Sequence, residues 1–358
     1  MSEQELGALV VDLDHLDVVL TAARELRQDL TLGPPEELRT LRLARVPVSA
    51  NVTASTFVDP EHLDLLLAQL RWWCAARFGG WTPEMGKDRR LEHIFAFGHP
   101  KSLAALPATA ADAPARSSSA LAGAGTGVRV TVLDVDPARA EAAGPQVSQV
   151  VGHGLFVTGL IDGLAPGAEV KVRGVLDADG RGDTWSVVKA LAAAVDEDHA
   201  QVVNLSLGCR TVDGAPPFVL RRAVEELSER VLLVAAAGNR WTDLAVAQRS
   251  QPTWPATLRG VVAVGAAGAD FSPRLPWVDY LAPGVDIVST FLDGVSTEES
   301  EGQTFHGYAK WSGTSFAAAH VTGAVAAALS SCSSARDALK HLAATEGSGI
   351  TRYRWQEV

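Results

Sequence analysis

From residue 128 onward, short apolar runs alternate with amphipathic segments, and this alternation constrains the fold more than any other feature of the chain. The runs VRVTVLDV, EVKVRGVL, QVVNLSLG, VLLVAAAG and GVVAVGAAG have the length and composition of buried strands. Between them, segments such as 184–197 carry apolar residues at helical spacing, with Asp183 or Thr184 as the N-cap. The pattern predicts an α/β fold: a mostly parallel sheet with helices on both faces, and function at the carboxyl ends of its strands.

The first third of the chain has a different pattern. A helix is expected at 61–78 and a strand at 41–50, which indicates a smaller N-terminal α/β domain. A stretch rich in alanine, serine and proline then indicates a linker. The predicted order is an N-terminal domain (1–101), a linker (102–126), the domain with the parallel sheet (127–345) and a C-terminal tail (346–358).

Composition argues against several classes of function. The formal net charge is −11 and the sequence has no basic cluster, so nucleic acid is not an expected partner. No apolar run reaches the roughly 20 residues of a membrane span. The acidic N-terminus does not resemble an export signal, so no membrane partner and a cytoplasmic location are expected.

The aromatic and sulfur-containing residues do not indicate a ligand or metal site. Trp72, Trp73 and Trp81 are interpreted as core residues rather than as a ligand site, because of their helical spacing. The three cysteines are too widely spaced for a disulfide framework or a metal knuckle and are interpreted as small buried thiols: Cys74, Cys209 and Cys332.

Four polar residues lie where predicted strands end or helices begin. They are Asp134 after VTVL, His153 between two glycines, Asn239 after AAAG, and Ser315 in GTSFAAAH before an alanine-rich helix. Each alone has an ordinary structural interpretation, since Asp and Ser often cap helices. Together they supply every part of nucleophilic catalysis: a serine, a base for its proton, an acid that orients the base, and an amide that stabilises an oxyanion.

These residues lie in motifs that resemble those of the subtilisin-like serine proteases, over about residues 127–330. VTVLD, HGLFVTGLI, NLSLG, AAAGN, LAPG and WSGTSFAAAH follow the order of the family. The resemblance implies an orienting acid at Asp134, a general base at His153, an oxyanion donor at Asn239 and a nucleophile at Ser315. It implies a serine endopeptidase that acts on an extended protein or peptide, and no cofactor is expected.

The resemblance also implies a groove in which the substrate adds as a strand between two edges. One edge is Ser206, Leu207 and Gly208, and the other is Gly180, Arg181 and Gly182. Arg240 follows the oxyanion donor and resembles part of the wall of the first side-chain pocket. There it would pair with an acidic substrate side chain, and the alternative is that it points to solvent.

Departures from the family pattern motivate a second hypothesis. Val135 and Asp136 stand where the family usually has Ser or Thr and then Gly, Leu155 and Phe156 replace Thr-His, and Ala319 replaces Pro. The alternative function is therefore a catalytically impaired fold that binds peptides. The segment after His153 is also too short and too poor in oxygen ligands for the calcium loop that the family often has there, so no metal is expected.

Three roles are open for residues 1–101. The family often has an inhibitory pro-domain at this place, and residues 102–126 have the composition of an extended segment that could enter the groove and be cut. A docking module for a partner and a structural extension are the other two roles.

Two further enzyme classes are disfavoured by the placement of their motifs. GAGTG precedes a predicted strand, whereas a dinucleotide site needs its glycines between strand and helix. Ser315 lies in GTSFA rather than in G-x-S-x-G, which argues against an α/β-hydrolase.

Overall fold

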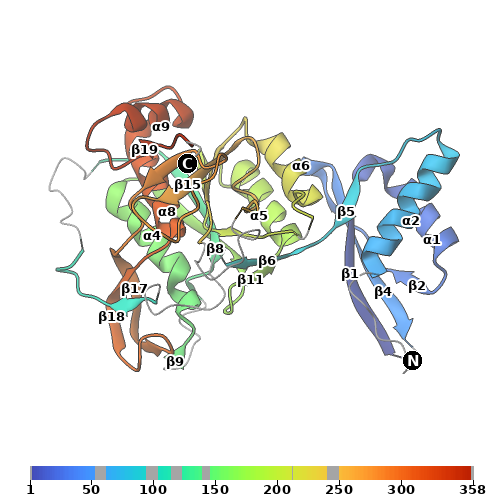
Figure 1. Ribbon diagram of the computed structural model, residues 1–358, viewed down its shortest axis with the longest axis horizontal. Coiled ribbons are helices and arrows are strands. Elements are labelled where there is room, and N and C mark those ends of the chain that lie inside the picture. Colours follow the sequence, from blue (N-terminus) through green and yellow to red (C-terminus); the bar gives the residue numbers. More distant parts are fainter. Residues whose placement is uncertain are drawn as a thin grey trace. The chain divides into compact units, whose positions relative to one another are not determined.

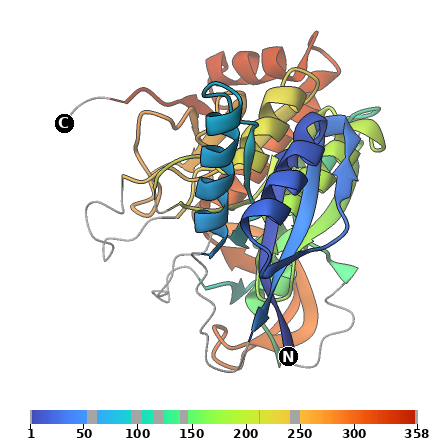
Figure 2. The same ribbon diagram turned by 90° about the vertical axis from the view of Figure 1, so that its right-hand side faces the viewer.

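The computed structural model describes residues 2–52, 62–93, 104–113, 123–138, 146–211, 213–239 and 250–355. The chain forms two compact units (Figures 1 and 2). Unit 1 comprises residues 1–89 with 217–223, and unit 2 comprises residues 90–216 with 224–358. Unit 1 ends before the predicted boundary at residue 101, because the strand that begins at Arg90 pairs with strands of unit 2.

Unit 1 is an antiparallel sheet with two α-helices. Its elements are β1 (Ser2–Asp12), η1 (Leu13–His15), α1 (Leu16–Leu26), β2 (Leu30–Leu32), β3 (Glu36–Leu38), η2 (Arg39–Leu41), β4 (Leu43–Val52), α2 (His62–Arg77) and β5 (Met85–Lys87). The strand order is β2-β4-β1-β5, and the short β3 also pairs with β4. Without β3 this is the β-α-β-β-α-β arrangement known as split β-α-β. Figure 2 shows α1 and α2 side by side over the strands.

The core of unit 1 contains residues of both helices and the sheet, such as Leu9 and Leu66. Of the three tryptophans predicted to be in the core, Trp73 is buried, but Trp72 is 68% exposed and Trp81 is 42% exposed. Neighbouring residues of an α-helix point about 100° apart. Trp72 and Trp73 therefore cannot both face the sheet, and the prediction was wrong for Trp72 and Trp81.

The first half of helix α6 (Phe218–Leu227) also belongs to unit 1. Arg222 donates a hydrogen bond to Asp12 at 2.9 Å and forms an ion pair with Glu84. Arg221 donates to Glu84 at 2.7 Å. The hydrogen bond from Arg221, followed by that from Arg222, lowers the pKa of Glu84. Charged hydrogen bonds thus join two segments of unit 1 that are far apart in the sequence.

Unit 2 contains the predicted parallel sheet, so the predicted fold class is confirmed. In spatial order its strands are β10 (Glu169–Leu176), β8 (Arg129–Val135), β12 (Val202–Leu205), β14 (Leu232–Ala236), β15 (Val261–Ala266), β16 (Tyr280–Ala282) and β19 (Thr351–Arg352). Neighbouring strands are parallel except β19, which adds residues of the predicted C-terminal tail antiparallel to β16.

The further helices of unit 2 are η4 (Gln149–Gly152), α4 (His153–Leu164), α5 (Thr184–Asp196), α8 (Thr314–Leu329) and α9 (Ala335–Ala344). Figure 1 shows α4 and α8 on one side of the strands and α5 on the other. Helices α4 and α8 pack against each other, and α8 packs against β12, β14 and β15. The small side chains of α8, which are mostly alanine, allow this close approach.

Two smaller sheets complete unit 2. One has the order β7 (Leu106–Pro107), β18 (Thr304–Trp311), β17 (Ile287–Thr297), β9 (Gln146–Val147), and the other has the order β11 (Arg181–Asp183), β6 (Arg90–His93), β13 (Leu207–Gly208).

Part of the predicted linker is packed on unit 2. Strand β7 pairs with β18, and Ala105 is fully buried, with its N–H donating to Gln149 Oε1 at 2.8 Å. The composition of residues 102–126 suggested little to bury, but small side chains also permit tight packing. The three cysteines, all of which lie in the described part of the chain, form no disulfide; Cys74 is buried, whereas Cys209 and Cys332 are only half-buried.

Candidate active site

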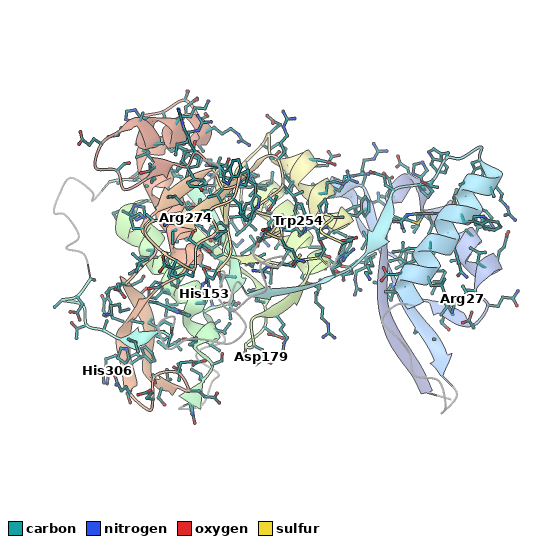
Figure 3. All side chains as sticks on the ribbon, in the orientation of Figure 1. Arg27, His153, Asp179, Trp254, Arg274 and His306 are labelled. Atoms are coloured by element: carbon teal, nitrogen blue, oxygen red, sulfur yellow. The ribbon has the colours of Figure 1, made fainter. Side chains whose placement is uncertain are left out.

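The site begins with a buried carboxylate and an imidazole at the carboxyl end of β8. Asp134 is fully buried, and His153, the first residue of α4, is 1% exposed. The Nδ1 atom of His153 lies 2.9 Å from both carboxylate oxygens of Asp134 (His153 is labelled in Figure 3). These contacts fix the orientation of the ring and direct Nε2 away from Asp134, as the acid and base of a catalytic triad require.

Backbone groups next to Asp134 and His153 also shape this pair. The N–H of Val135 donates to Asp134 Oδ1 at 2.8 Å, so the backbone supplies a donor to this carboxylate. The carboxylate of Asp136 accepts the N–H of Ala138 at 3.0 Å. A Cβ on Gly154 would lie 2.2 Å from the carbonyl oxygen of Val135, so glycine is needed for α4 to start this close to β8.

Ser315 lies in the first turn of α8 and is buried. Its Oγ donates to the carbonyl oxygen of Ser206 at 3.4 Å, and the Oγ of Ser206 donates to the carbonyl oxygen of Ser315 at 3.2 Å. Phe316 places its ring 5.5 Å from that of His153, between ring centroids. The predicted nucleophile thus lies beside the LSLG segment, and Phe316, the residue after it, packs against the ring of the predicted base.

Asn239 follows β14 and is held by Thr314, the residue before Ser315. The N–H and the hydroxyl of Thr314 both donate to Asn239 Oδ1, at 3.0 and 3.1 Å. The N–H of Gly238 in turn donates to the hydroxyl of Thr314 at 3.1 Å. Because Oδ1 is fixed in this way, the Nδ2 donor has a set direction. Sequence reasoning missed Thr314, although its place between Gly313 and Ser315 in the GTS motif was a signal.

The two predicted groove edges lie on either side of the chain's own strand β6. Arg181, Gly182 and Asp183 of β11 pair with Glu92, Leu91 and Arg90, and on the other side Leu207 and Gly208 of β13 pair with His93 and Glu92. Both pairings are antiparallel. The groove residues thus bind an extended backbone, and that backbone is residues 90–93 rather than the predicted linker.

Two of the six predicted edge residues lie beside the strands rather than in them. Gly180 forms the turn before β11 with φ of +75°, and its N–H donates to the carbonyl oxygen of Asp177. Ser206 precedes β13 and contacts Ser315 instead. Arg240 lies outside the described residues, so its role in the first pocket stays a prediction.

The remaining predictions concern metals and membranes. In the part of the chain that the structure describes, no group of three or more His, Cys, Asp or Glu side chains is arranged to hold a metal ion. Within the same residues, every helix is too short or too polar to cross a membrane.

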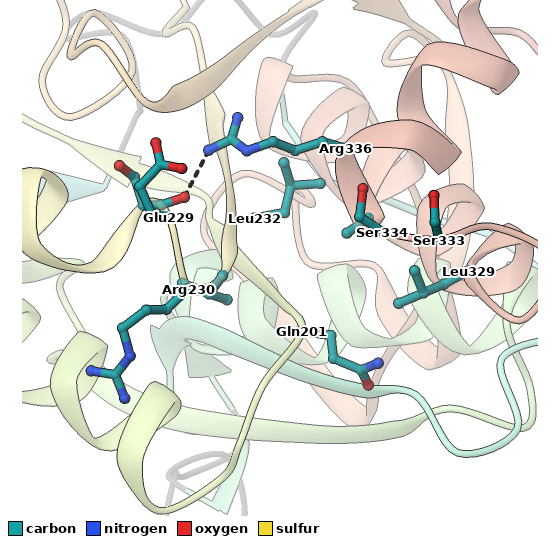
Figure 4. Close-up of a pocket in the computed structure, with 11 residues that line it drawn as sticks. Gln201, Glu229, Arg230, Leu232, Leu329, Ser333, Ser334 and Arg336 are labelled. Atoms are coloured by element: carbon teal, nitrogen blue, oxygen red, sulfur yellow. Dashed lines mark hydrogen bonds between the residues drawn. The ribbon is translucent and has the colours of Figure 1, made fainter.

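A hollow of about 280 Å³ lies at the opposite, amino-terminal ends of the parallel strands (Figure 4). Gln201 and Leu232, at the starts of β12 and β14, line it together with Ser334 and Arg336 at the start of α9. The guanidinium of Arg336 donates to the carbonyl oxygen of Ser228 at 2.8 Å, drawn as a dashed line in Figure 4. Asp134 lies near the carboxyl end of β8, so this hollow is separate from the candidate active site.

Comparison with known proteins agrees with this geometry. The Subtilase family model matches residues 128–348. A "Thermophilic serine proteinase" from Bacillus sp. (strain AK1) is 33% identical over 202 residues, which are 54% of this chain and 44% of the relative. "Subtilisin BL" from Lederbergia lenta is 36% identical over 197 residues, 51% of this chain and 64% of the relative. The matches thus span about half to two thirds of these relatives.

A solved structure supports the same fold. The crystal structure of a lanthipeptide protease has a TM-score of 0.52 and 22% sequence identity, and the match covers 63% of this chain and 81% of that one. At this identity the likeness concerns the fold alone. The family match extends over more than half of the chain and includes all four candidate residues. The chain therefore belongs to the subtilase family.

Proposed function

We propose that this chain is a serine endopeptidase that hydrolyses peptide bonds in an extended protein or peptide segment. The observation that carries the proposal is the buried Asp134–His153 pair, with Nδ1 at 2.9 Å from both carboxylate oxygens, at the sheet end where Ser315 also lies. A helix-start serine and a fixed carboxamide also lie at the carboxyl ends of the parallel strands, and together with the pair they are the parts of a catalytic site.

Each residue has a defined part in the proposed reaction. His153 Nε2 takes the proton of the Ser315 hydroxyl as Oγ attacks the substrate carbonyl carbon, and then gives that proton to the amine that leaves. Asp134 keeps the ring oriented and stabilises its charged form. The Nδ2 of Asn239 and the backbone N–H of Ser315 stabilise the negative oxygen. Water then releases the acyl group by the same route.

A fluorophosphonate probe tests this proposal, because it reacts with a serine only when a base activates it. We expect labelling at Ser315 in the wild type, together with cleavage of unstructured peptides, and loss of both in Ser315→Ala. The rate of cleavage should fall at least about 10³-fold. Near-wild-type turnover in Ser315→Ala would refute the assignment of the site.

The alternative function is a catalytically impaired fold that binds peptides. The pairing of β6 with both edges favours this alternative, because these edges already hold an extended strand. The two functions differ in one readout. Wild-type protein that binds extended peptides but is never labelled at Ser315, even after residues 1–93 are removed by added protease, would support the binding module and reject the enzyme.

We also infer that strand β6 keeps the enzyme inactive until it is displaced. A strand that occupies both edges excludes a substrate from the same backbone hydrogen bonds. The carboxyl end of β6 pairs with Leu207, next to Ser206, whose carbonyl oxygen contacts Ser315. The chain after His93 is therefore the segment that we expect the enzyme to cut first. This interpretation moves the expected cleavage from residues 102–126 to the few residues after His93.

Intact mass after incubation decides between the roles of residues 1–101. Self-processing predicts that the wild type converts to a fragment that begins shortly after residue 93, while Ser315→Ala stays full length. A wild type that remains full length yet cleaves an added peptide would reject self-inhibition and favour docking of a partner or a structural extension.

The cytoplasmic location and the absence of a metal remain predictions from the sequence.

A further inference from the structure

His153 lies against two aromatic rings that come from other parts of unit 2. Its ring centroid is 5.6 Å from that of Trp311, at the end of β18, with the two planes at 87°. It is 5.5 Å from that of Phe316, in α8, with the planes at 37°. Both aromatic side chains are buried, at 2% exposure each. The ring of His153 is therefore confined by aromatic side chains as well as by its contact with Asp134.

Phe156 supports these two rings. Its centroid lies 4.4 Å from that of Phe316 and 5.7 Å from that of Trp311, and it is fully buried. Trp311 and Phe316 also contact each other, at 5.2 Å. Phe156 is one of the residues that depart from the family's usual Thr-His at this place. The aromatic side chain that replaces a family residue at position 156 thus packs with Trp311 and Phe316, and all three rings are buried.

Such rings interact differently with the two forms of a histidine. A neutral imidazole gains ordinary ring packing from them. A cation that lies over the face of an aromatic ring, within about 6 Å of its centroid, gains an additional electrostatic attraction, which is stronger when water is excluded. His153 becomes positively charged when it takes the proton of Ser315, and it loses that charge when the proton passes to the leaving amine. An interaction that exists only while the ring is charged accelerates the reaction without tightening substrate binding.

We propose that Trp311 and Phe316 are positioning residues that hold the His153 ring and stabilise its charged form during peptide-bond cleavage. The inference rests on the proposed function, because it needs His153 to act as the base.

The chain provides a matched pair of variants to test this role. Phe316→Leu removes a ring that contacts His153. Phe291→Leu makes the same change one ring farther out, where the ring of Phe291 packs on Phe156, Trp311 and Phe305. Both phenylalanines are buried, so both variants should lose melting temperature to a similar extent. Trp311→Leu and Trp311→Phe form a second pair, in which the phenylalanine keeps an aromatic face.

The readouts are the rate constant of fluorophosphonate labelling at Ser315, kcat and KM on one peptide, and the melting temperature of each full-length variant. We expect Phe316→Leu and Trp311→Leu to lower kcat and the labelling rate about 3- to 30-fold with KM nearly unchanged. Phe291→Leu should leave the rates nearly unchanged, and Trp311→Phe should restore most of the activity that Trp311→Leu loses.

Several outcomes would overturn the inference. Equal losses of rate in Phe316→Leu and Phe291→Leu would mean that core packing alone matters. A change confined to KM would place the rings in substrate binding, and a Trp311→Phe variant as slow as Trp311→Leu would exclude an aromatic contribution. A wild type that is not labelled at Ser315 would instead refute the proposed function itself, and this inference with it.

Discussion

Two buried carboxylates in the same unit are held in opposite ways. Asp134, near the carboxyl end of β8, is bound by the ring of His153 and by the N–H of Val135. Asp198 follows α5, at the other end of the sheet, and its side chain is 5% exposed. It accepts hydrogen bonds from side chains of β8 and β10: Lys171 Nζ at 2.5 Å, Arg173 Nε at 2.6 Å and Thr131 Oγ1 at 3.1 Å.

The difference lies in whether the partner's charge can change. Arginine and lysine remain protonated at ordinary pH, so the negative charge of Asp198 is permanently matched. Burial by itself raises the pKa of Asp198, but hydrogen bonds from Arg173 and Lys171 lower it to about 2. A histidine can gain and lose a proton near neutral pH, so the charge beside Asp134 can come and go during a reaction. The comparison separates a carboxylate suited to catalysis from one suited to structure.

Asp134→Asn should produce the largest effect that this comparison predicts. The carboxamide can still accept the N–H of Val135 through Oδ1, but its NH₂ group would face His153 Nδ1 and favour the wrong tautomer of the ring. We expect kcat to fall about 10⁴-fold, with a melting temperature close to that of the wild type. Peptide hydrolysis and thermal unfolding of the same preparation measure the two quantities. A large fall in stability with substantial kcat retained would show that Asp134 is structural.

Asn239→Ala should have a smaller effect that is confined to rate. Thr314 fixes the carboxamide so that Nδ2 is available to a developing oxyanion, which the ground state of the substrate does not need. Loss of one such donor costs about 10²–10³ in kcat, and KM should change little. Thr314→Val provides a test of orientation, since the backbone N–H bond remains while the hydroxyl bond is lost. An effect of Asn239→Ala on KM alone would mean that this side chain only binds substrate.

Features that depend on local patterns could be predicted from the sequence. The helix expected at 184–197 is α5 at Thr184–Asp196, and Asp183 rather than Thr184 caps it, through a 2.7 Å bond from the N–H of Ser186. Buried strands such as β8 follow their apolar runs closely, because burial on both faces leaves little choice of side chain. Asp134 and His153 could be placed because each lies at a strand or helix junction within a motif.

Features that depend on distant segments could not be predicted. Strand β6 has four residues without a strong pattern, and its partners lie about ninety to more than a hundred residues later in β11 and β13. Main-chain hydrogen bonds of this kind can be formed by every residue type except proline, so the residue types carry little information about the pairing. The contact of Trp311 and Phe316 with His153 likewise needs the register of β18 and the start of α8. The sequence shows these aromatic residues, but it does not show which of them meet.

Asp198→Asn should reverse the pattern of Asp134→Asn, with lower stability and nearly unchanged kcat. The substitution leaves Lys171 and Arg173 close together without the charge that both contact. Lys171 is 58% exposed, so solvent screens part of the effect. We expect the free energy of unfolding to fall by about 1–3 kcal/mol. Urea unfolding is measured in a Ser315→Ala background, which avoids self-cleavage, and kcat is measured with Ser315 present. A kcat loss as large as that of Asp134→Asn would contradict the distinction between the two carboxylates.

The pH dependence of that stability difference is the finest test. The pKa of Asp198 in the folded chain, about 2, lies below the ordinary value of 3.8. A carboxylate with a lowered pKa stabilises the folded form at pH values above its ordinary pKa, and this contribution disappears as the pH falls toward the folded value. The gap in unfolding free energy between the parent and Asp198→Asn should therefore be constant from neutral pH to about pH 5 and shrink between about pH 4 and pH 2. The paired measurement cancels the titration of other carboxylates, which both proteins share. If this difference in unfolding free energy did not change over the pH range, hydrogen-bond geometry rather than charge would account for the stabilising contacts of Asp198. Asp198 would then differ from Asp134 only in its position.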